Sequence, residues 1–291
     1  MKKVLITGAN SYIGTRFENY VKEYYADELQ VDTVDMIDGS WREKDFSGYD
    51  TVFHVAGLAH ADVGNVSEEV KKKYYAINTD LTIETAKKAK AEGVGQFVFM
   101  SSIIVYGESA GIGKQRVITK DTPLTPANFY GDSKVKAEEG IGKLDDESFK
   151  VVILRPPMIY GKGSKGNYPL LEKMAKKLPV FPDIRNERSM LYIGNLCEFI
   201  YLMIKNEEKG IFYPQNAEYV CTCDMVKEIS RIYGKSIRLI KIFNPMILLL
   251  GKIGGKPGKI VNKAFGNLVY EKSMSTYRDE YQCDFMELFR E

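Results

Sequence analysis

The chain has 291 residues, of which 44% are hydrophobic and 27% are charged, and its net charge at pH 7 is +2. This length suits one large α/β domain with a lobe attached or two modest domains, and the composition is ordinary for a packed globular protein. The small net charge argues against a nucleic-acid-binding protein. The apolar run at 245–250 is far shorter than the ~20 residues of a membrane span.

The N-terminus predicts a cytoplasmic protein, and this location in turn predicts reduced cysteines. Residues 1–6 carry two lysines with no longer apolar region after them, so we expect no signal peptide, and residues 4–6 indicate a buried first strand. Reduced thiols are therefore favoured over a metal site for the four cysteines, which are Cys197, Cys221, Cys223 and Cys283.

Strand and helix patterns alternate through the first half of the chain. Buried strands are predicted at residues 3–7, 31–36, 51–56, 96–100 and 150–154. Helices are predicted at residues 12–25, 67–91 and 128–142. This alternation predicts an α/β fold with right-handed crossovers, in which a doubly wound parallel sheet is covered on both faces.

The pattern becomes less regular after Arg155. Glycines and prolines crowd residues 156–182, and helical patches follow at 195–205 and 224–233. We therefore expect a first domain at 1–155 and, mainly in 156–291, a smaller C-terminal α/β lobe interleaved with the last strand or strands of the sheet. The apolar patch at 246–250 favours a helix packed on this lobe or at a subunit contact over one that touches a membrane.

A glycine-containing turn follows the first strand. Gly8 lets the backbone turn sharply and lets a pyrophosphate approach, whereas Gly14 lets the following helix pack closely on the strand. The N-terminus of that helix offers N–H groups and a positive dipole end to phosphates. This context favours dinucleotide binding over a purely structural turn. The intervening residues expected to contact the cofactor are Asn10, Ser11, Tyr12 and Ile13.

An acidic residue at the end of the second strand is the expected partner of the adenosine ribose. Asp35 is the favoured candidate, with Asp32 and Asp38 as alternatives. Because a carboxylate repels a 2′-phosphate, this position weakly favours NAD and leaves NADP open.

Three residues predict hydride chemistry on an alcohol. Tyr130 and Lys134 are four residues apart and share one face of a predicted helix, and Ser102 follows a buried strand. A lysine ammonium and a positive nicotinamide ring would both favour the phenolate of Tyr130, which could then act as a general base. Lys134 could also hold the nicotinamide ribose, and Ser102 could orient the reacting oxygen.

Together these residues resemble the extended short-chain dehydrogenase/reductase superfamily, in particular its NAD-dependent nucleotide-sugar epimerase/dehydratase family. That family's T-G-x-x-G-x-x-G motif matches Thr7, Gly8 and Gly14, with Ser11 at a position where glycine is usual. The resemblance implies a Rossmann-type fold, a cytoplasmic enzyme of polysaccharide biosynthesis, and a homodimer formed through the helices at 67–91 and 128–142. Further cofactor contacts or supports that it implies are His54, Ala56, Gly57 and Asn78.

The same resemblance places the substrate diphosphate near Asn167 and Arg188. The alternatives are a turn residue for Asn167 and a surface ion-pair residue for Arg188. Arg278 is a weaker candidate, and His60 is expected in a loop.

Two departures from the family bear on the reaction. Ile103 and Ile104 stand where 4,6-dehydratases carry an Asp-Glu pair, which argues against dehydration. The short stretch 35–54 resembles that of 4-keto-sugar reductases. With dehydration disfavoured, the leading hypothesis is an NAD-dependent 4-epimerase acting on a UDP-hexose or UDP-N-acetylhexosamine through a 4-keto intermediate. A 4-keto-6-deoxy-sugar reductase using NAD(P)H is the alternative, and a non-catalytic binding module is a third.

Overall fold

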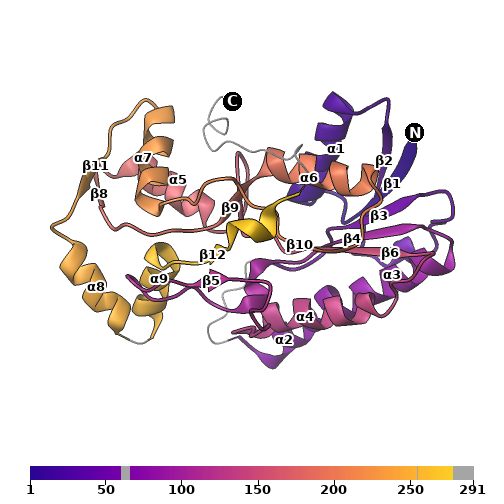
Figure 1. Ribbon diagram of the computed structural model, residues 1–291, viewed down its shortest axis with the longest axis horizontal. Helices are drawn as coiled ribbons and strands as arrows, with labels where there is room; N and C mark the ends of the chain where they lie inside the picture. Colours follow the sequence, from indigo (N-terminus) through magenta and orange to yellow (C-terminus); the bar gives the residue numbers. More distant parts are fainter. Residues whose placement is uncertain (60–65, 254, 278–291) are drawn as a thin grey trace. The chain divides into compact units, whose positions relative to one another are not determined.

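The computed structural model describes residues 1–59, 66–253 and 255–277 (Figure 1), so His60, Arg278 and Cys283 lie outside the described residues. The chain forms two compact units. Unit 1 comprises residues 1–107, 123–157 and 193–214, and unit 2 comprises 108–122, 158–192 and 215–291. No helix among the described residues has both the length and the apolar content needed to cross a bilayer.

Unit 1 contains a six-stranded parallel sheet, which confirms the predicted fold class. Its strands lie in the order β10-β6-β4-β3-β1-β2, and every neighbouring pair is parallel. The chain changes direction across the sheet between β1 and β3, and doubly wound sheets bind ligands at the carboxyl ends of the strands beside such a point. The strands are β1 (Lys2–Thr7), β2 (Leu29–Val34), β3 (Thr51–His54), β4 (Gln96–Met100), β6 (Lys150–Leu154) and β10 (Gly210–Phe212).

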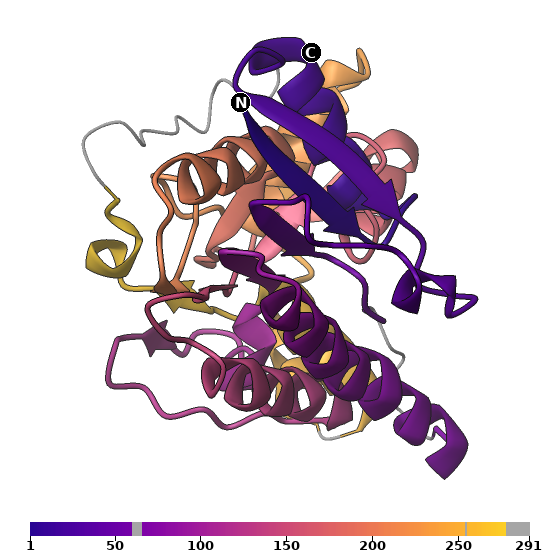
Figure 2. The ribbon, with the colours of Figure 1, turned by 90° about the vertical axis from the view of Figure 1, so that its right-hand side faces the viewer.

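Helices cover both faces of this sheet (Figure 2). On one face α1 (Tyr12–Tyr24) packs against α6 (Ile193–Lys205), and on the other α3 (Leu81–Ala91) packs against α4 (Phe129–Gly142). The predicted helix at 67–91 is interrupted: α2 (Glu68–Tyr75) and α3 are joined by a π-helical turn at Ala76–Asp80. Such a turn inserts one extra residue per turn and often marks a functional position.

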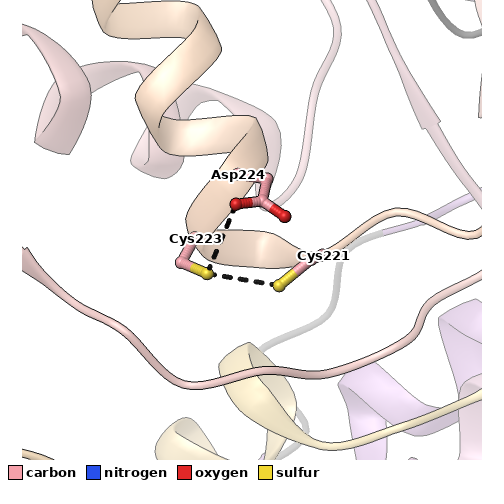
Figure 3. Close-up of side chains that lie close together, drawn as sticks. All are labelled: Cys221, Cys223 and Asp224. Carbon is pink, nitrogen blue, oxygen red and sulfur yellow. Dashed lines mark hydrogen bonds between the residues drawn. The ribbon is translucent and has the colours of Figure 1, made fainter. Parts of the chain in front are cut away.

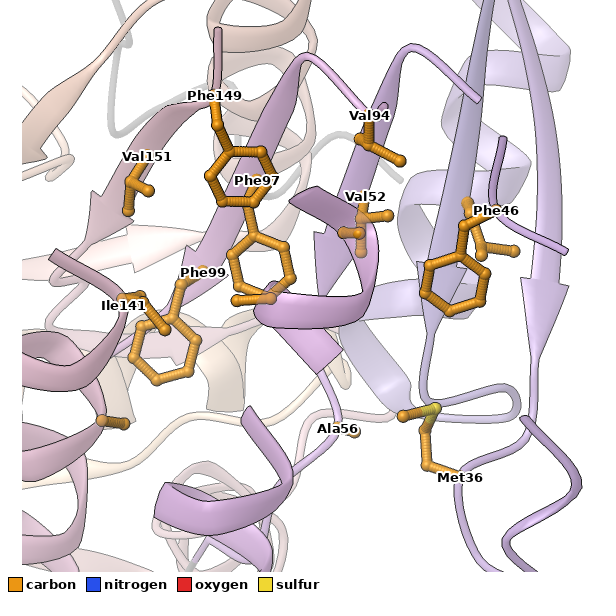
Figure 4. Close-up of a cluster of buried hydrophobic side chains, with 14 of the residues drawn as sticks. Met36, Phe46, Val52, Ala56, Val94, Phe97, Phe99, Ile141, Phe149 and Val151 are labelled. Atoms are coloured by element: carbon orange, nitrogen blue, oxygen red, sulfur yellow. The ribbon is translucent and has the colours of Figure 1, made fainter. Parts of the chain in front are cut away.

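The short connection between β2 and β3 has the compact form that the sequence predicted. It holds only a 3₁₀ turn, Ser40–Arg42, so β2 is an edge strand of the sheet. Trp41 and Phe46 are fully buried and extend the core beneath α3 and α4, where Figure 4 shows Phe46 near the sheet residue Val52. Burial of these two large side chains holds the connection against the sheet.

Unit 2 is less regular. Among its described residues it has three two-stranded sheets, which pair β7 with β9, β8 with β11, and β5 with β12. The last pairing places residues 108–122 in unit 2, although the sequence assigned them to the first domain. The strands are β5 (Val117–Ile118), β7 (Met158–Tyr160), β8 (Val180–Pro182), β9 (Met190–Tyr192), β11 (Arg238–Ile240) and β12 (Val269–Tyr270). The helices are α5 (Tyr168–Lys177), α7 (Thr222–Ile232), α8 (Asn244–Lys252), α9 (Lys256–Phe265) and the 3₁₀ turn Lys272–Ser275.

Candidate active site

The turn after β1 is built around Gly8. Its φ is +103°, and an added Cβ would lie 2.9 Å from the backbone nitrogen of Ala56. Any side chain here would be strained in its backbone and would collide with the segment that follows β3. The amides of Gly8 and Ala9 donate to the carbonyl of Val34 at 2.9 and 3.1 Å, which ties the turn to the end of β2.

Ser11 closes the turn and caps α1. Its hydroxyl accepts a hydrogen bond from the amide of Gly14 at 3.1 Å, and its φ of −69° does not require glycine. Gly14 must be small, because an added Cβ would lie 2.6 Å from the Ser11 hydroxyl. No acidic residue lies in the first turn of α1, so its positive dipole end faces no carboxylate of its own. The turn therefore fits the phosphates of a dinucleotide.

The other residues of this turn differ in exposure. Asn10 is exposed with a positive φ of 63°, a conformation that asparagine tolerates better than most residues. Tyr12 and Ile13 form the first turn of α1 and are half-buried. All three therefore lie where a bound phosphate would approach the helix.

The three candidate ribose acids have different surroundings. Asp32 accepts a hydrogen bond from the hydroxyl of Tyr49 at 2.9 Å, and Asp38 accepts from Ser40 in the next turn. Asp35 is exposed, directly follows β2, and is the neighbour of Val34, which anchors the Gly8 turn. Its position favours Asp35 as the ribose acid.

The His54 side chain does not face a ligand surface. Its imidazole is fully buried at the end of β3 and hydrogen-bonds the hydroxyls of Thr7 at 2.7 Å and Thr82 at 3.1 Å. Burial and the charge of Lys134 lower the pKa of His54 to about 3, so the ring is neutral at pH 7. The ring joins the sheet to α3, and only the backbone of His54 is available to a cofactor.

Asn78, in the π-helical turn, fastens the segment after β3. Its amide oxygen accepts from the Leu58 amide at 2.7 Å, and its nitrogen donates to the Leu58 carbonyl at 3.0 Å and the Ser133 hydroxyl at 3.1 Å. An added Cβ on Gly57 would lie 3.1 Å from the Asn78 oxygen and 3.4 Å from Nζ of Lys134. Asn78 thus holds the segment containing Ala56 and Gly57 beside α4.

Ser102 and Tyr130 meet beyond the carboxyl end of β4. Ser102 caps the 3₁₀ turn Ile103–Tyr106, and its hydroxyl hydrogen-bonds Tyr130. Asn128 caps α4, and Gly131 lets that helix pack closely, because a Cβ there would lie 2.9 Å from the carbonyl oxygen of Ile104. This close packing brings the first turn of α4 to Ser102.

Lys134 lies one turn further along α4, as its spacing predicted. Its Nζ donates to the Met100 carbonyl at the end of β4 at 2.9 Å and lies 4.6 Å from the ring centre of Phe99. Burial outweighs the charge of Glu138 and lowers the pKa of Lys134 to about 8. The amine is therefore held at the strand end beside Gly57.

The structure corrects one electrostatic expectation. Lys134 was expected to lower the pKa of Tyr130, but burial raises the pKa of Tyr130 to about 12, and the hydrogen bond from Ser102 only partly opposes this. The reason is that desolvation of a buried phenolate outweighs the protein's own favourable contacts. The phenol is consequently protonated at neutral pH unless a further positive charge is added.

Sequence reasoning missed a buried polar network next to the candidate catalytic residues. The Arg155 guanidinium donates to Glu138, at 2.5 Å for the shortest contact, and to the Tyr106 hydroxyl at 2.7 Å. The Ser101 hydroxyl donates to the same carboxylate. Glu138 lies four residues beyond Lys134 on α4, so helical spacing was the signal that could have revealed it. The network connects α4 to β4 and β6.

A cavity of about 340 Å³ in unit 1 lies on the other side of this network. Its lining includes Glu138, Arg155 and Ile211, but none of Ser102, Tyr130 and Lys134. The cavity is therefore separate from the three candidate catalytic residues.

The two predicted diphosphate contacts are both in unit 2. Asn167 occupies the N-cap position of α5 and is half-buried, and its side chain makes no capping hydrogen bond. The Arg188 guanidinium donates to the carbonyls of Lys263 at 2.9 Å and Gly266 at 3.1 Å. Burial lowers the pKa of Arg188 to about 10, and within the described ranges no carboxylate forms an ion pair with it. An anionic ligand suits such a guanidinium better than the surface ion pair considered as its alternative.

The start of α7 brings two cysteines together (Figure 3). The sulfurs of Cys221 and Cys223 are 3.2 Å apart, and with Asp224 they form a group whose ligand atoms all lie within 4.8 Å. Both carboxylate oxygens of Asp224 accept from Arg185, at 2.9 and 2.7 Å. A cation would have to compete with Arg185 for this carboxylate, so the geometry favours the predicted thiol character.

Comparison with known proteins decides the family. The family model described as the NAD dependent epimerase/dehydratase family matches residues 4–213. This chain belongs to that family. A UDP-glucose 4-epimerase from Vibrio cholerae is 31% identical over 290 residues, which cover 92% of this chain and 86% of that protein. The family membership confirms an NAD(P)-dependent enzyme of the extended short-chain dehydrogenase/reductase type.

Two further comparisons give a second relative that is similar in sequence and a solved structure that is similar in fold. An N-acetyl-alpha-D-glucosaminyl-diphospho-ditrans,octacis-undecaprenol 4-epimerase from Escherichia coli O157:H7 is 29% identical, covering 90% of this chain and 81% of that protein. The solved dTDP-4-dehydrorhamnose reductase from Clostridium acetobutylicum has a TM-score of 0.67 at 18% identity, covering 94% of this chain and 91% of that one. At that identity the structural match shows the shared fold alone.

Proposed function

We propose that this protein is an NAD-dependent 4-epimerase of a nucleotide-diphosphate sugar, such as a UDP-hexose or a UDP-N-acetylhexosamine. The proposal is carried by Ser102, which lies beside Tyr130, and by Lys134, which lies one turn further along α4 and donates to the Met100 carbonyl at the carboxyl end of β4. Two relatives, each aligned with at least 90% of this chain, are named 4-epimerases. The family description and the position of Asp35 both favour NAD, and NADP is the alternative cofactor.

Each residue has a distinct task in this proposal. Ser102 donates to the sugar O4 and orients it, and Tyr130 accepts the O4 proton and later returns it. Lys134 holds the nicotinamide ribose beside Gly57, and Arg188 and Asn167 bind the substrate diphosphate. When bound, oxidised NAD would supply a hydride acceptor for C4 and a positive ring beside the phenol. Because the protein leaves the pKa of Tyr130 at about 12, we infer that its phenolate forms only with that added charge.

A direct test follows the ionisation of Tyr130. Tyrosinate absorbance is titrated in the protein alone, with NAD⁺ and with NADH, and the signal is assigned by subtracting the Tyr130→Phe variant. We expect NAD⁺ to lower the pKa and NADH, whose ring is neutral, to lower it much less. Equal titration curves in all three states would refute the proposed activation of Tyr130.

The reaction itself is tested with UDP-hexoses and UDP-N-acetylhexosamines without added cofactor. Interconversion of 4-epimers supports the proposal, since an epimerase returns the hydride and consumes no cofactor. Turnover restricted to a 4-keto sugar with NAD(P)H would instead support the reductase, which the short β2–β3 connection favours. If no sugar nucleotide supports hydride transfer, the third hypothesis, a non-catalytic binding module, would be favoured.

The proposal includes a cytoplasmic homodimer that acts in polysaccharide biosynthesis. Its expected interface is formed by α2, α3 and α4, whose exposed faces include Lys72, Lys87 and Lys136. Sedimentation equilibrium of the purified protein tests this part, and a monomer at all concentrations would contradict it.

A further inference from the structure

The C-terminal part of unit 2 has an unusual charge distribution. Residues 229–270 contain eight lysines and arginines and no aspartate or glutamate. The rest of the chain is acidic, because it holds the other 33 of the 41 basic residues and all 39 acidic residues. The basic segment includes α8 and α9, which are also rich in apolar residues.

One stripe of α8 and its flanks exposes large apolar side chains. Ile242, Met246, Leu249 and Ile253 follow one another at intervals of four, three and four residues, and are 78, 57, 61 and 50% exposed. Met246 and Leu249 lie on one face of α8, and Ile242 and Ile253 flank the two ends of the helix. Ile260 of α9 is also exposed, at 65%. We call these five residues with Lys252 and Lys259 the α8–α9 face.

The exposure of this face follows from how the helix pair is anchored. Ile247 of α8 and Phe265 of α9 are buried in the core of unit 2. The Asn262 side chain donates to the carbonyl of Gly251 at 2.9 Å, which links the two helices. With Ile247 turned into the core, Met246 and Leu249 are directed to solvent.

The charges restrict what can cover this face. Lys252 and Lys259 are exposed, and neither forms an ion pair among the residues that the structure describes. A second copy of the same face would bring like charges together, which is unfavourable. A surface that combines anionic groups with an apolar layer matches both features, and basic amphipathic helices bind in the interface of anionic bilayers.

We propose that the α8–α9 face docks onto the surface of an anionic phospholipid bilayer, with its apolar stripe among the headgroups and its lysines at the lipid phosphates. The nine residues of α8 are too few to span a bilayer but suit this in-plane position. The helix at 246–250 packs on the lobe through Ile247, as the sequence predicts, and the proposal concerns only its exposed side. If unit 2 binds the substrate diphosphate, as the proposed function holds, docking would also bring that site to sugar diphosphates carried on membrane lipids.

The experiment is co-sedimentation of the full-length protein with vesicles of phosphatidylcholine, with or without phosphatidylglycerol. We expect binding to the anionic vesicles at low salt, little binding to the neutral ones, and release at high salt because the charges are screened. Lys252→Gln/Lys259→Gln should weaken binding about 25-fold, since each lysine near an anionic surface contributes about fivefold. Met246→Ser/Leu249→Ser should weaken it as well.

Matched control variants carry equivalent changes elsewhere in unit 2. Lys173→Gln/Lys177→Gln alters two exposed lysines of α5, and Leu178→Ser/Ile232→Ser alters two exposed apolar residues away from the face. Both controls should bind vesicles like the unaltered protein. Failure to bind anionic vesicles at low salt, or equal losses in face and control variants, would overturn the proposal.

Oligomerisation that is lost in Met246→Ser/Leu249→Ser, without vesicle binding, would also overturn the proposal by assigning the face to a protein contact. Turnover of a soluble UDP-sugar is measured on the same variants and should not change. Vesicle binding without epimerisation would therefore contradict the proposed function alone, and epimerisation without vesicle binding would contradict the docking alone.

Discussion

In unit 1 the polar groups of the candidate site lie at the ends of strands in one six-stranded sheet, whereas the described part of unit 2 has its strands in three two-stranded sheets. The continuous parallel sheet places Gly8, Gly57 and Ser102 just beyond the carboxyl ends of β1, β3 and β4. No such rule relates Asn167, at the start of α5, to Arg188, which lies between β8 and β9. A regular sheet therefore makes the location of chemistry predictable, and a lobe of short sheets and loops does not.

The largest effect expected is on unit 1, from Tyr130→Phe. Loss of the hydroxyl removes the proposed general base, so kcat should fall by about 10²–10⁴-fold. Because the ring remains, binding of NAD, measured by fluorescence, should be nearly unchanged. Substantial turnover in this variant would show that Tyr130 is not the general base. It would also contradict the view that the regular sheet of unit 1 makes the catalytic residues predictable.

A second prediction compares buried and exposed ion pairs. Glu138→Ala leaves the buried Arg155 without its carboxylate and should cost about 3–5 kcal/mol of unfolding free energy in urea titrations. Glu172→Ala breaks a partly exposed pair with Lys176 on α5 of unit 2, and should cost no more than about 1 kcal/mol. Similar losses in both variants would show that burial does not distinguish these pairs.

A third prediction concerns substrate binding by unit 2. Arg188→Met should raise the KM for a UDP-sugar by about tenfold or more, since hydrogen bonds to charged groups contribute about 1.5–3 kcal/mol. Arg188→Lys should recover only part of the loss, because an ammonium cannot contact two phosphate oxygens as a guanidinium fork does. NAD affinity is the control. A decrease in kcat or thermal stability with no change in KM would assign Arg188 a structural role at the carbonyls of Lys263 and Gly266.

The smallest effect on turnover is expected from alkylation of the cysteine pair of unit 2, which has no role in the proposed reaction. The hydrogen bond from Cys223 lowers the pKa of Cys221 to about 6, so Cys221 should be a thiolate above that pH and react rapidly with iodoacetamide. Its rate of alkylation should rise through about pH 6 and level off by pH 7. Burial raises the pKa of Cys197 to about 12, and this thiol should stay unreactive. Equal labelling of Cys197 and Cys221 in the folded protein would contradict the assignment.

The sequence alone determined much of unit 1. Buried strands separated by helices predict a doubly wound parallel sheet, and the spacing of Tyr130 and Lys134 puts them on one helix face near Ser102. These signals are local or periodic, so they survive without knowledge of distant contacts. The short connection at 35–54 was visible in the same way, as a segment too short for another strand and helix.

Only the tertiary structure decided the electrostatics and the surfaces. The raised pKa of Tyr130, the neutral buried His54 and the Glu138–Arg155 pair depend on burial and on groups that are far apart in the chain. The exposure of the apolar side chains on α8 likewise depends on Ile247 entering the core of unit 2. The sequence of an apolar helix does not show which of its sides is covered. Desolvation and packing depend on the folded surroundings of a residue, and the amino-acid type alone does not determine them.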